Sequence, residues 1–107
     1  DNIINSAIRY IDENCSCKLT LNMLADRFYM SPQYFSMYFK KLTNKKFIEY
    51  LTEARMKKAV MLLNNTSMSA SNICHEVGYS HLGHFYDIFK KYYGMTPAEY
   101  KKNNRKQ

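Results

Sequence analysis

The chain of 107 residues carries 16 Lys and Arg against nine Asp and Glu, a net charge of +7. This length suits one domain with a modest core. The excess of positive charge favours a polyanionic partner, either nucleic acid or an anionic membrane surface. The alternative is that the charge only keeps the chain soluble. The longest aliphatic run, 59–63, is far shorter than the ~20 residues of a membrane span. We therefore expect no membrane insertion.

Cysteine usage and the spacing of reactive side chains argue against a disulfide scaffold or a catalytic site. Three cysteines are an odd number without a scaffold pattern, which favours a reducing, cytoplasmic compartment. Cys15-x-Cys17 matches no redox or zinc motif, and His81 and His84 lack the H-E-x2-H context of zinc enzymes. No glycine-rich phosphate loop or nucleophile elbow occurs, and the carboxylates are scattered. We expect no enzyme activity, no metal and no cofactor.

Apolar residues recur at helical spacing along nearly the whole chain, whereas strand signals are scarce. The longest pattern is rich in Ala, Leu, Met, Lys and Glu, which are strong helix formers. We therefore predict an all-α fold with seven helices. In chain order they are expected at about 4–11, 21–28, 32–42, 47–64, 70–77, 81–92 and 97–102.

Several predicted helix ends carry their own capping residues. Ser31-Pro32 and Thr96-Pro97 each place a side-chain acceptor at the N-cap and a proline at the first helical position. Glu99 completes a capping box with the second of these. Gly78 and Gly94 follow apolar runs, as left-handed helix stops do.

The chain also repeats itself at an offset of fifty residues without a gap. Between residues 20 and 50, eight of 31 positions are identical, more than we expect by chance from this composition. The pairs are Asn22/Asn72, Tyr29/Tyr79, Phe35/Phe85, Phe39/Phe89, Lys40/Lys90, Lys41/Lys91, Glu49/Glu99 and Tyr50/Tyr100. Two copies are too few for a solenoid, so the repeat indicates a duplicated supersecondary unit.

Each copy is predicted as a short helix, a tight connection and a second helix, which is the form of a helix-turn-helix. We expect one domain over 1–107, as a fragment of a longer protein. Its parts are a first helix-turn-helix at about 20–43, a linker helix at about 47–64, a second helix-turn-helix at about 70–93 and a basic tail at 101–107.

The second helix of a helix-turn-helix lies in a DNA major groove, so its outward face matters most. In the first copy, the helical rotation of 100° per residue predicts four residues on the inward face: Phe35, Tyr38, Phe39 and Leu42. The outward set is then Gln33, Ser36, Met37 and Lys40. A Gln side chain can form hydrogen bonds with the edge of adenine, and a Ser hydroxyl can donate or accept a hydrogen bond. Met can contact a thymine methyl, and Lys can reach guanine or a phosphate.

The second copy presents fewer base-reading groups. Its inward set is Phe85, Ile88, Phe89 and Tyr92, and its outward set is Gly83, Tyr86, Asp87 and Lys90, with Leu82 at the helix start. Phosphates repel Asp87 unless it meets a cytosine amine. The linker helix of about 18 residues spans about 27 Å, so two reading helices can meet successive major grooves about 34 Å apart if the linker is rigid or the DNA bends.

Three segments together resemble the C-terminal DNA-binding domain of AraC/XylS family transcription regulators, most like the output domain of YesN-type response regulators. They are LNMLADRFYMSPQYFSMYFKK, YLTEARMKKAVMLL and NICHEVGYSHLGHFYDIFKKYYGMTPAEY, in that order. The resemblance implies sequence-specific binding of double-stranded DNA in a bacterial transcription regulator. It also implies RNA polymerase or a fused N-terminal regulatory domain as a partner, and a monomeric isolated domain.

The resemblance further implies which residues touch DNA. The base-reading positions map onto Gln33, Ser36, Met37, Lys40, Leu82, Gly83, Tyr86 and Asp87. The phosphate contacts map onto Ser31, Lys41, Lys45, Lys46, Ser80, His81, Lys90 and Lys91. The lysines among them are also the residues that charge alone selects.

Two departures from the family pattern bear on function. Asn44 stands where Gly is usual after the first reading helix, and Gly83 lies inside the second one, where it costs up to about 1 kcal/mol relative to Ala. We expect the second copy to contribute less to sequence choice. The rival hypothesis is a basic helical protein-interaction module that binds an acidic partner.

Overall fold

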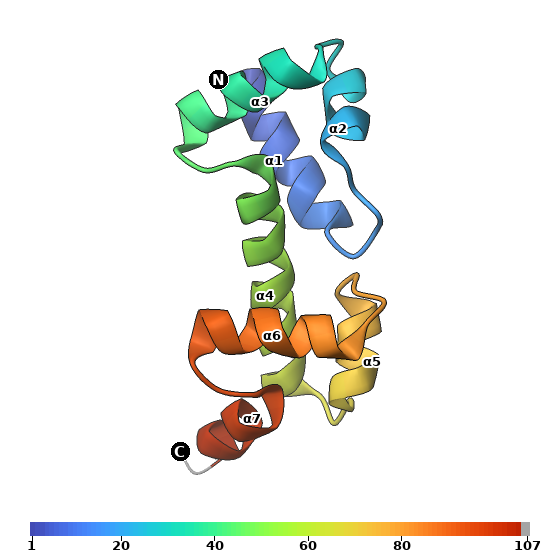
Figure 1. The fold of residues 1–107 in the computed structure, drawn as a ribbon, viewed down its shortest axis with the longest axis vertical. Coiled ribbons are helices and arrows are strands. Elements are labelled where there is room, and N and C mark those ends of the chain that lie inside the picture. Colours follow the sequence, from blue (N-terminus) through green and yellow to red (C-terminus); the bar gives the residue numbers. More distant parts are fainter. Residues whose placement is uncertain (106–107) are drawn as a thin grey trace. The chain divides into compact units, whose positions relative to one another are not determined.

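The computed structural model describes residues 1–105, so the last two residues of the predicted basic tail, 101–107, lie outside the described part. Within it the chain forms seven α-helices and no strand, which confirms the predicted all-α fold (Figure 1). The helices are α1 (Asn2–Asn14), α2 (Leu21–Arg27), α3 (Pro32–Thr43), α4 (Phe47–Asn65), α5 (Ala70–Glu76), α6 (Leu82–Tyr93) and α7 (Pro97–Arg105).

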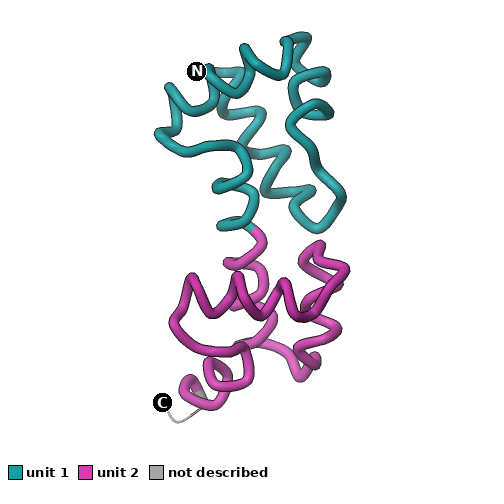
Figure 2. Tube along the Cα trace, in the orientation of Figure 1, with its two compact units in different colours: residues 1–54 teal, residues 55–107 magenta. Residues whose placement is uncertain are grey.

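The chain divides into two compact units, residues 1–54 and residues 55–107, and the division falls inside α4 (Figure 2). Unit 1 contains α1, α2, α3 and the start of α4, and unit 2 contains the rest of α4 with α5, α6 and α7. Each unit has its own hydrophobic core. The helix-turn-helix pairs are α2 with α3 and α5 with α6.

The core of unit 1 is built around two phenylalanines of α3. Phe35 and Phe39 are fully buried, and the Phe39 ring meets the Tyr50 ring edge-on at 5.8 Å between centroids. Burying each Phe contributes about 2 kcal/mol of hydrophobic stabilisation, and the edge-on aromatic pair adds about 1 kcal/mol. This packing holds α3 against α1 and the start of α4, so the opposite side of α3 faces solvent.

Unit 2 repeats this arrangement. Phe85 and Phe89 of α6 are fully buried, and the Phe89 ring meets Tyr100 of α7 edge-on at 5.7 Å. Because the same aromatic pairs anchor both second helices, the scaffold residues of the sequence repeat are Phe35/Phe85, Phe39/Phe89 and Tyr50/Tyr100.

The predicted helix caps are present. The Ser31 hydroxyl accepts the Tyr34 backbone N–H at 3.1 Å. Thr96 and Glu99 form the capping box, with bonds of 3.0 Å from the Thr96 N–H and 3.2 Å from the Glu99 N–H. Asn44 and Gly94 end α3 and α6 in the left-handed region, with φ of 62° and 74°.

The gapless offset of fifty is wrong for the first helix of each pair. Helices α3 and α6 begin 50 residues apart, at Pro32 and Leu82, whereas α2 and α5 begin 49 apart, at Leu21 and Ala70. The connection from α2 to α3 has four residues, 28–31, and that from α5 to α6 has five, 77–81. The second copy therefore carries one extra residue in its turn.

This extra residue changes which positions correspond. The identities Asn22/Asn72 and Tyr29/Tyr79 do not join equivalent sites. The left-handed residue of the first turn is Tyr29, with φ of 59°, and that of the second is Gly78, with φ of 106°. The site equivalent to Tyr79 is Met30, since both donate a backbone N–H to the last turn of the preceding helix.

Candidate nucleic-acid interface

Helix α3 presents most of the predicted reading face to solvent. Gln33 and Lys40 are exposed, Met37 is 71% exposed, and Ser36 is half-buried. Leu42, which helical periodicity placed inward, is 45% exposed instead. Leu42 lies in the last turn of α3 and borders a surface groove, so the core does not cover it.

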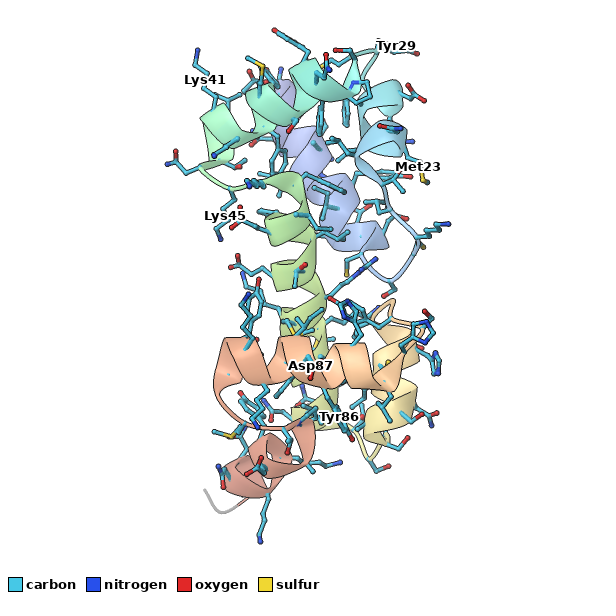
Figure 3. All side chains as sticks on the ribbon, viewed as in Figure 1. Met23, Tyr29, Lys41, Lys45, Tyr86 and Asp87 are labelled. Carbon is cyan, nitrogen blue, oxygen red and sulfur yellow. The ribbon has the colours of Figure 1, made fainter. Side chains whose placement is uncertain are left out.

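Helix α6 differs from its prediction at two aromatic residues. Tyr86, expected on the outward face, is half-buried and packs against Phe85 at 6.3 Å between ring centroids. Tyr92, expected inward, is 43% exposed. Figure 3 shows Asp87 and Tyr86 on α6, and of the two only Asp87 is solvent-exposed. Whether a large aromatic side chain is buried depends on the apolar residues that pack around it. Helical periodicity alone therefore predicted the wrong exposure for both tyrosines.

Leu82, Gly83 and Asp87 are exposed as predicted. A Cβ added at Gly83 meets nothing within 4 Å, so the packing of unit 2 does not require glycine there. Its place on the exposed face leaves room for another backbone or a base edge to approach closely. With Leu82 and Gly83 among its exposed residues, the predicted base-reading face of α6 carries fewer hydrogen-bonding side chains than that of α3.

Most of the predicted phosphate contacts are exposed and lie on α3 and α6 or in the connections next to them. Figure 3 shows Lys41 extending from α3 into solvent. Lys46, Lys90 and Lys91 are also exposed, as are Ser31, Ser80 and His81 in the turns before α3 and α6. His81 occupies the N-cap of α6 without a side-chain capping bond, so capping does not engage its imidazole.

Lys45 differs from the other predicted phosphate contacts because its ammonium forms an ion pair with the Glu53 carboxylate of α4. The two side chains are 44% and 33% exposed, so water screens the pair in part. Burial is the largest cause that raises the pKa of the Tyr50 phenol, followed by the charges of Asp12 and Glu53. Because the Glu53 carboxylate already pairs with the Lys45 ammonium, a phosphate that reaches Lys45 must compete with that carboxylate.

Tyr34 on α3 was not among the residues predicted to contact DNA. Tyr34 is 56% exposed, and its ring stacks on Tyr38 at 6.0 Å between centroids. The i, i+4 spacing of the two tyrosines is the sequence signal that identifies such a pair. Tyr29 also stood out only in the structure, being 98% exposed in a left-handed turn.

Across residues 1–105, no three His, Cys, Asp or Glu side chains gather in a way that could hold a metal ion. None of the helices in the same range is long and apolar enough to cross a membrane. What the described surface offers is two exposed helix faces with lysines and hydroxyls beside them.

Two helix pairs of this form, each with a second helix anchored by buried phenylalanines, define a double helix-turn-helix domain. A protein-family model described as "Helix-turn-helix domain" matches residues 24–103. The chain belongs to this AraC-type helix-turn-helix family, which confirms the resemblance seen in the sequence.

The relatives agree with this assignment. The regulatory protein PocR of Salmonella typhimurium is 35% identical over 101 residues, which are 94% of this chain and 33% of that protein. The C-terminal domain of the two-component response regulator yesN from Fusobacterium nucleatum is 33% identical with a TM-score of 0.91, over 94% of this chain and 99% of that one. The chain thus spans about a third of the curated relative.

A third similarity concerns the fold alone. The DNA-binding domain of AdpA, a global transcriptional factor solved in complex with a target DNA, is 24% identical with a TM-score of 0.91 and covers 95% of this chain and 92% of that one.

Proposed function

We propose that the chain binds double-stranded DNA sequence-specifically, as the output domain of a bacterial transcription regulator. The observation that carries this is the duplicated unit, in which a helix anchored by two buried phenylalanines exposes a face with a lysine pair beside it. Family membership supports the proposal. The role requires no catalytic group, and a cytoplasmic setting follows from it.

In this proposal α3 and α6 enter successive major grooves. Each unit supplies one of these two helices. On α3, Gln33, Ser36, Met37 and Lys40 read bases. On α6 the proposed base-reading residues are Leu82, Gly83, Tyr86 and Asp87, of which Tyr86 is half-buried.

Phosphate contacts fix the register of both helices without reading sequence. We assign them to Ser31, Lys41, Lys46, Ser80, His81, Lys90 and Lys91. Lys45 also belongs to this set, but a phosphate there has to displace the Glu53 carboxylate. The Ser31 oxygen caps α3, but its hydroxyl proton is still able to donate to a phosphate oxygen. RNA polymerase or a fused regulatory domain is the further partner proposed, and the isolated domain is proposed to be a monomer.

Selection of duplexes from a random pool, followed by fluorescence anisotropy against scrambled duplexes, tests the function. The expected result is a preferred sequence and an affinity that falls steeply with salt. A rival acidic protein partner predicts no preference among duplexes. Equal affinity for all sequences, with no dependence on salt, contradicts DNA binding.

Two substitutions distinguish base recognition from phosphate contact. Gln33→Ala is expected to relax the preference at one base pair by about 1–3 kcal/mol, whereas Lys41→Ala weakens binding to all sequences alike and reduces the salt slope by about one. Lys102→Ala on α7 is the charge-matched control, because Lys102 is exposed and outside the predicted contacts. Identical effects of the Gln33 and Lys41 substitutions on every duplex contradict the assigned roles.

A further inference from the structure

The turn between α2 and α3 holds Tyr29 in a strained backbone conformation. The Tyr29 N–H donates to the Asp26 carbonyl at 3.1 Å, and the Met30 N–H donates to the Ala25 carbonyl at 3.0 Å. These two bonds form a Schellman motif, in which the residue after the C-cap is left-handed and is usually glycine. Here that residue is a tyrosine with φ of 59°, a conformation that a bulky side chain rarely adopts.

Unit 2 forms the same motif with glycine at this position. Gly78 has φ of 106°, and its N–H donates to the His75 carbonyl at 3.1 Å. The following N–H, of Tyr79, donates to the Cys74 carbonyl at 3.0 Å. The motif therefore needs no side chain at this position, and glycine avoids the clash that a Cβ meets in the left-handed region. The tyrosine of unit 1 makes the folded chain less stable than a glycine there would.

Packing within unit 1 does not offset this strain. Tyr29 is 98% exposed, whereas Phe28 and Met30 on either side of it are half-buried. Figure 3 shows Tyr29 extending outward from the turn. Among residues 1–105, its ring joins no aromatic pair and its hydroxyl has no hydrogen-bond partner. Backbone strain with no compensating contact inside the fold indicates a contact with another molecule.

The place of this turn in a helix-turn-helix identifies the molecule that Tyr29 meets. In this motif the first helix crosses the DNA backbone, and the N-terminal residues of the second helix reach the bases. The connection between the two helices therefore lies over the sugar–phosphate backbone at the edge of the groove. Ser31, which caps α3 and is a proposed phosphate contact, follows Tyr29 by two residues, so about 7 Å at most separates their Cα atoms. A strand held by Ser31 thus passes within reach of the Tyr29 side chain.

We propose that the Tyr29 hydroxyl donates a hydrogen bond to a phosphate oxygen of this strand. Tyrosine is among the side chains that contact DNA phosphates. With two side-chain torsions, it loses less conformational entropy on binding than a lysine does, and the hydrogen-bonded turn fixes its direction beforehand. Because Gly78 has no side chain, only unit 1 makes this contact. The inference rests on the proposed function and adds a DNA-binding residue outside the predicted set.

Removal of the hydroxyl alone tests this contact. Tyr29→Phe keeps the ring and the backbone strain, so the midpoint of urea unfolding should not change. Affinity for every duplex should fall about tenfold, the effect of a lost hydrogen bond to a charged group. Because a phenol carries no charge at neutral pH, the slope of log affinity against log salt should stay the same, unlike in Lys41→Ala.

Tyr10→Phe is the matched control, since it removes one hydroxyl from a half-buried tyrosine of α1. Affinity of Tyr29→Phe equal to that of Tyr10→Phe overturns the proposal and leaves sequence-specific binding intact. A chain that prefers no duplex at all fails the proposed function instead.

Tyr29→Gly distinguishes a role in binding from a role in the fold. Glycine relieves the strain of the left-handed backbone, so the midpoint of urea unfolding should rise, while affinity for DNA should fall at least as far as in Tyr29→Phe. If the midpoint and the affinity both fall, Tyr29 has a structural role and the proposal is wrong. Affinity lost only in Tyr29→Gly assigns the contact to the ring, and full affinity in both variants places the partner of Tyr29 outside DNA; either result overturns the hydroxyl contact.

Methylphosphonate scanning locates the phosphate. Each phosphate of the selected duplex is replaced in turn by an uncharged methylphosphonate. At one position the replacement should weaken binding of the unaltered chain more than that of Tyr29→Phe, because both changes disrupt the same hydrogen bond. The Tyr10→Phe control should respond like the unaltered chain at every position. If each replacement has the same effect on Tyr29→Phe as on the unaltered chain, the hydroxyl meets no phosphate and the proposal is overturned.

Discussion

Replacing Glu53 by Gln removes the carboxylate that pairs with the Lys45 ammonium and keeps the length of the side chain. Lys45 lies in the short connection between α3 and α4, next to the exposed Lys46. In the unaltered chain a phosphate has to displace Glu53 to reach Lys45. We therefore expect Glu53→Gln to bind every duplex more tightly, without a change in sequence preference.

The exposure of the pair limits the size of this effect. With the two side chains 44% and 33% exposed, the pair is worth up to about 1 kcal/mol, so its loss should strengthen DNA binding by up to about fivefold. If Lys45 then neutralises one more phosphate, the slope of log affinity against log salt steepens by about 0.9. Both changes should be absent in a Lys45→Ala, Glu53→Gln double variant.

Fluorescence anisotropy at a series of salt concentrations measures both quantities. Glu13→Gln is the matched control, because Glu13 is an exposed acid of α1 and its loss makes the same change in net charge. Spectrophotometric titration gives a second readout: since Glu53 helps to raise the pKa of Tyr50, the variant should shift that pKa toward its ordinary value. Equal affinity and equal slope for the Glu53 and Glu13 variants would refute the competition between Glu53 and phosphate.

Three further predictions concern stability and reactivity. Gly83→Ala should stabilise the fold by up to about 1 kcal/mol, because the added Cβ lies in a helix and meets nothing within 4 Å. Gly94→Ala should destabilise the fold by about 1 kcal/mol, because Gly94 has a φ of +74°. Urea unfolding measures both changes. The hydrogen bond from the Thr96 backbone is the largest cause that lowers the pKa of Glu99, so Glu99 stabilises the fold above its ordinary pKa and this contribution is lost as pH falls through the lowered value. Glu99→Gln should consequently differ from the unaltered chain at neutral pH and converge with it in acid. Exposed Cys17 should react quickly with a thiol reagent, and Cys74 only on unfolding, since Cys74 is buried and burial raises its pKa.

Each of these has an opposing outcome. A Gly83→Ala variant less stable than the unaltered chain would contradict the open space at that Cβ. A constant difference between the Glu99→Gln variant and the unaltered chain down to acid pH would show that ionised Glu99 does not cap α7. Equal reaction rates of Cys17 and Cys74 in the folded chain would contradict the burial of Cys74.

Helix positions and caps followed from the sequence because they depend on near neighbours. The Ser31 hydroxyl caps the N–H three residues later, and Thr96 and Glu99 cap one another at the same spacing. The buried stripe of Phe35 and Phe39 has helical periodicity, so the face opposite to it was also predictable, including the exposure of Met37. Motif likeness then identified the family.

The register of the repeat required the structure. An alignment without a gap hides the extra residue of the second turn, because chance identities such as Tyr29 with Tyr79 mask the shift of one position. Tyr86 and Leu42 were misplaced for a related reason: whether an aromatic or aliphatic residue is buried depends on which surface packs over it, and that surface comes from another helix.

The sequence by itself determined the helices, their caps, the phenylalanine anchors and the family, all of which are local or periodic properties of the chain. Only the tertiary structure decided that Lys45 pairs with Glu53 and that the Tyr38 hydroxyl donates to the Asp1 carboxylate. The physical reason is that each of these contacts joins residues that do not share a helix. Local helix propensity does not determine which of such side chains meet on folding.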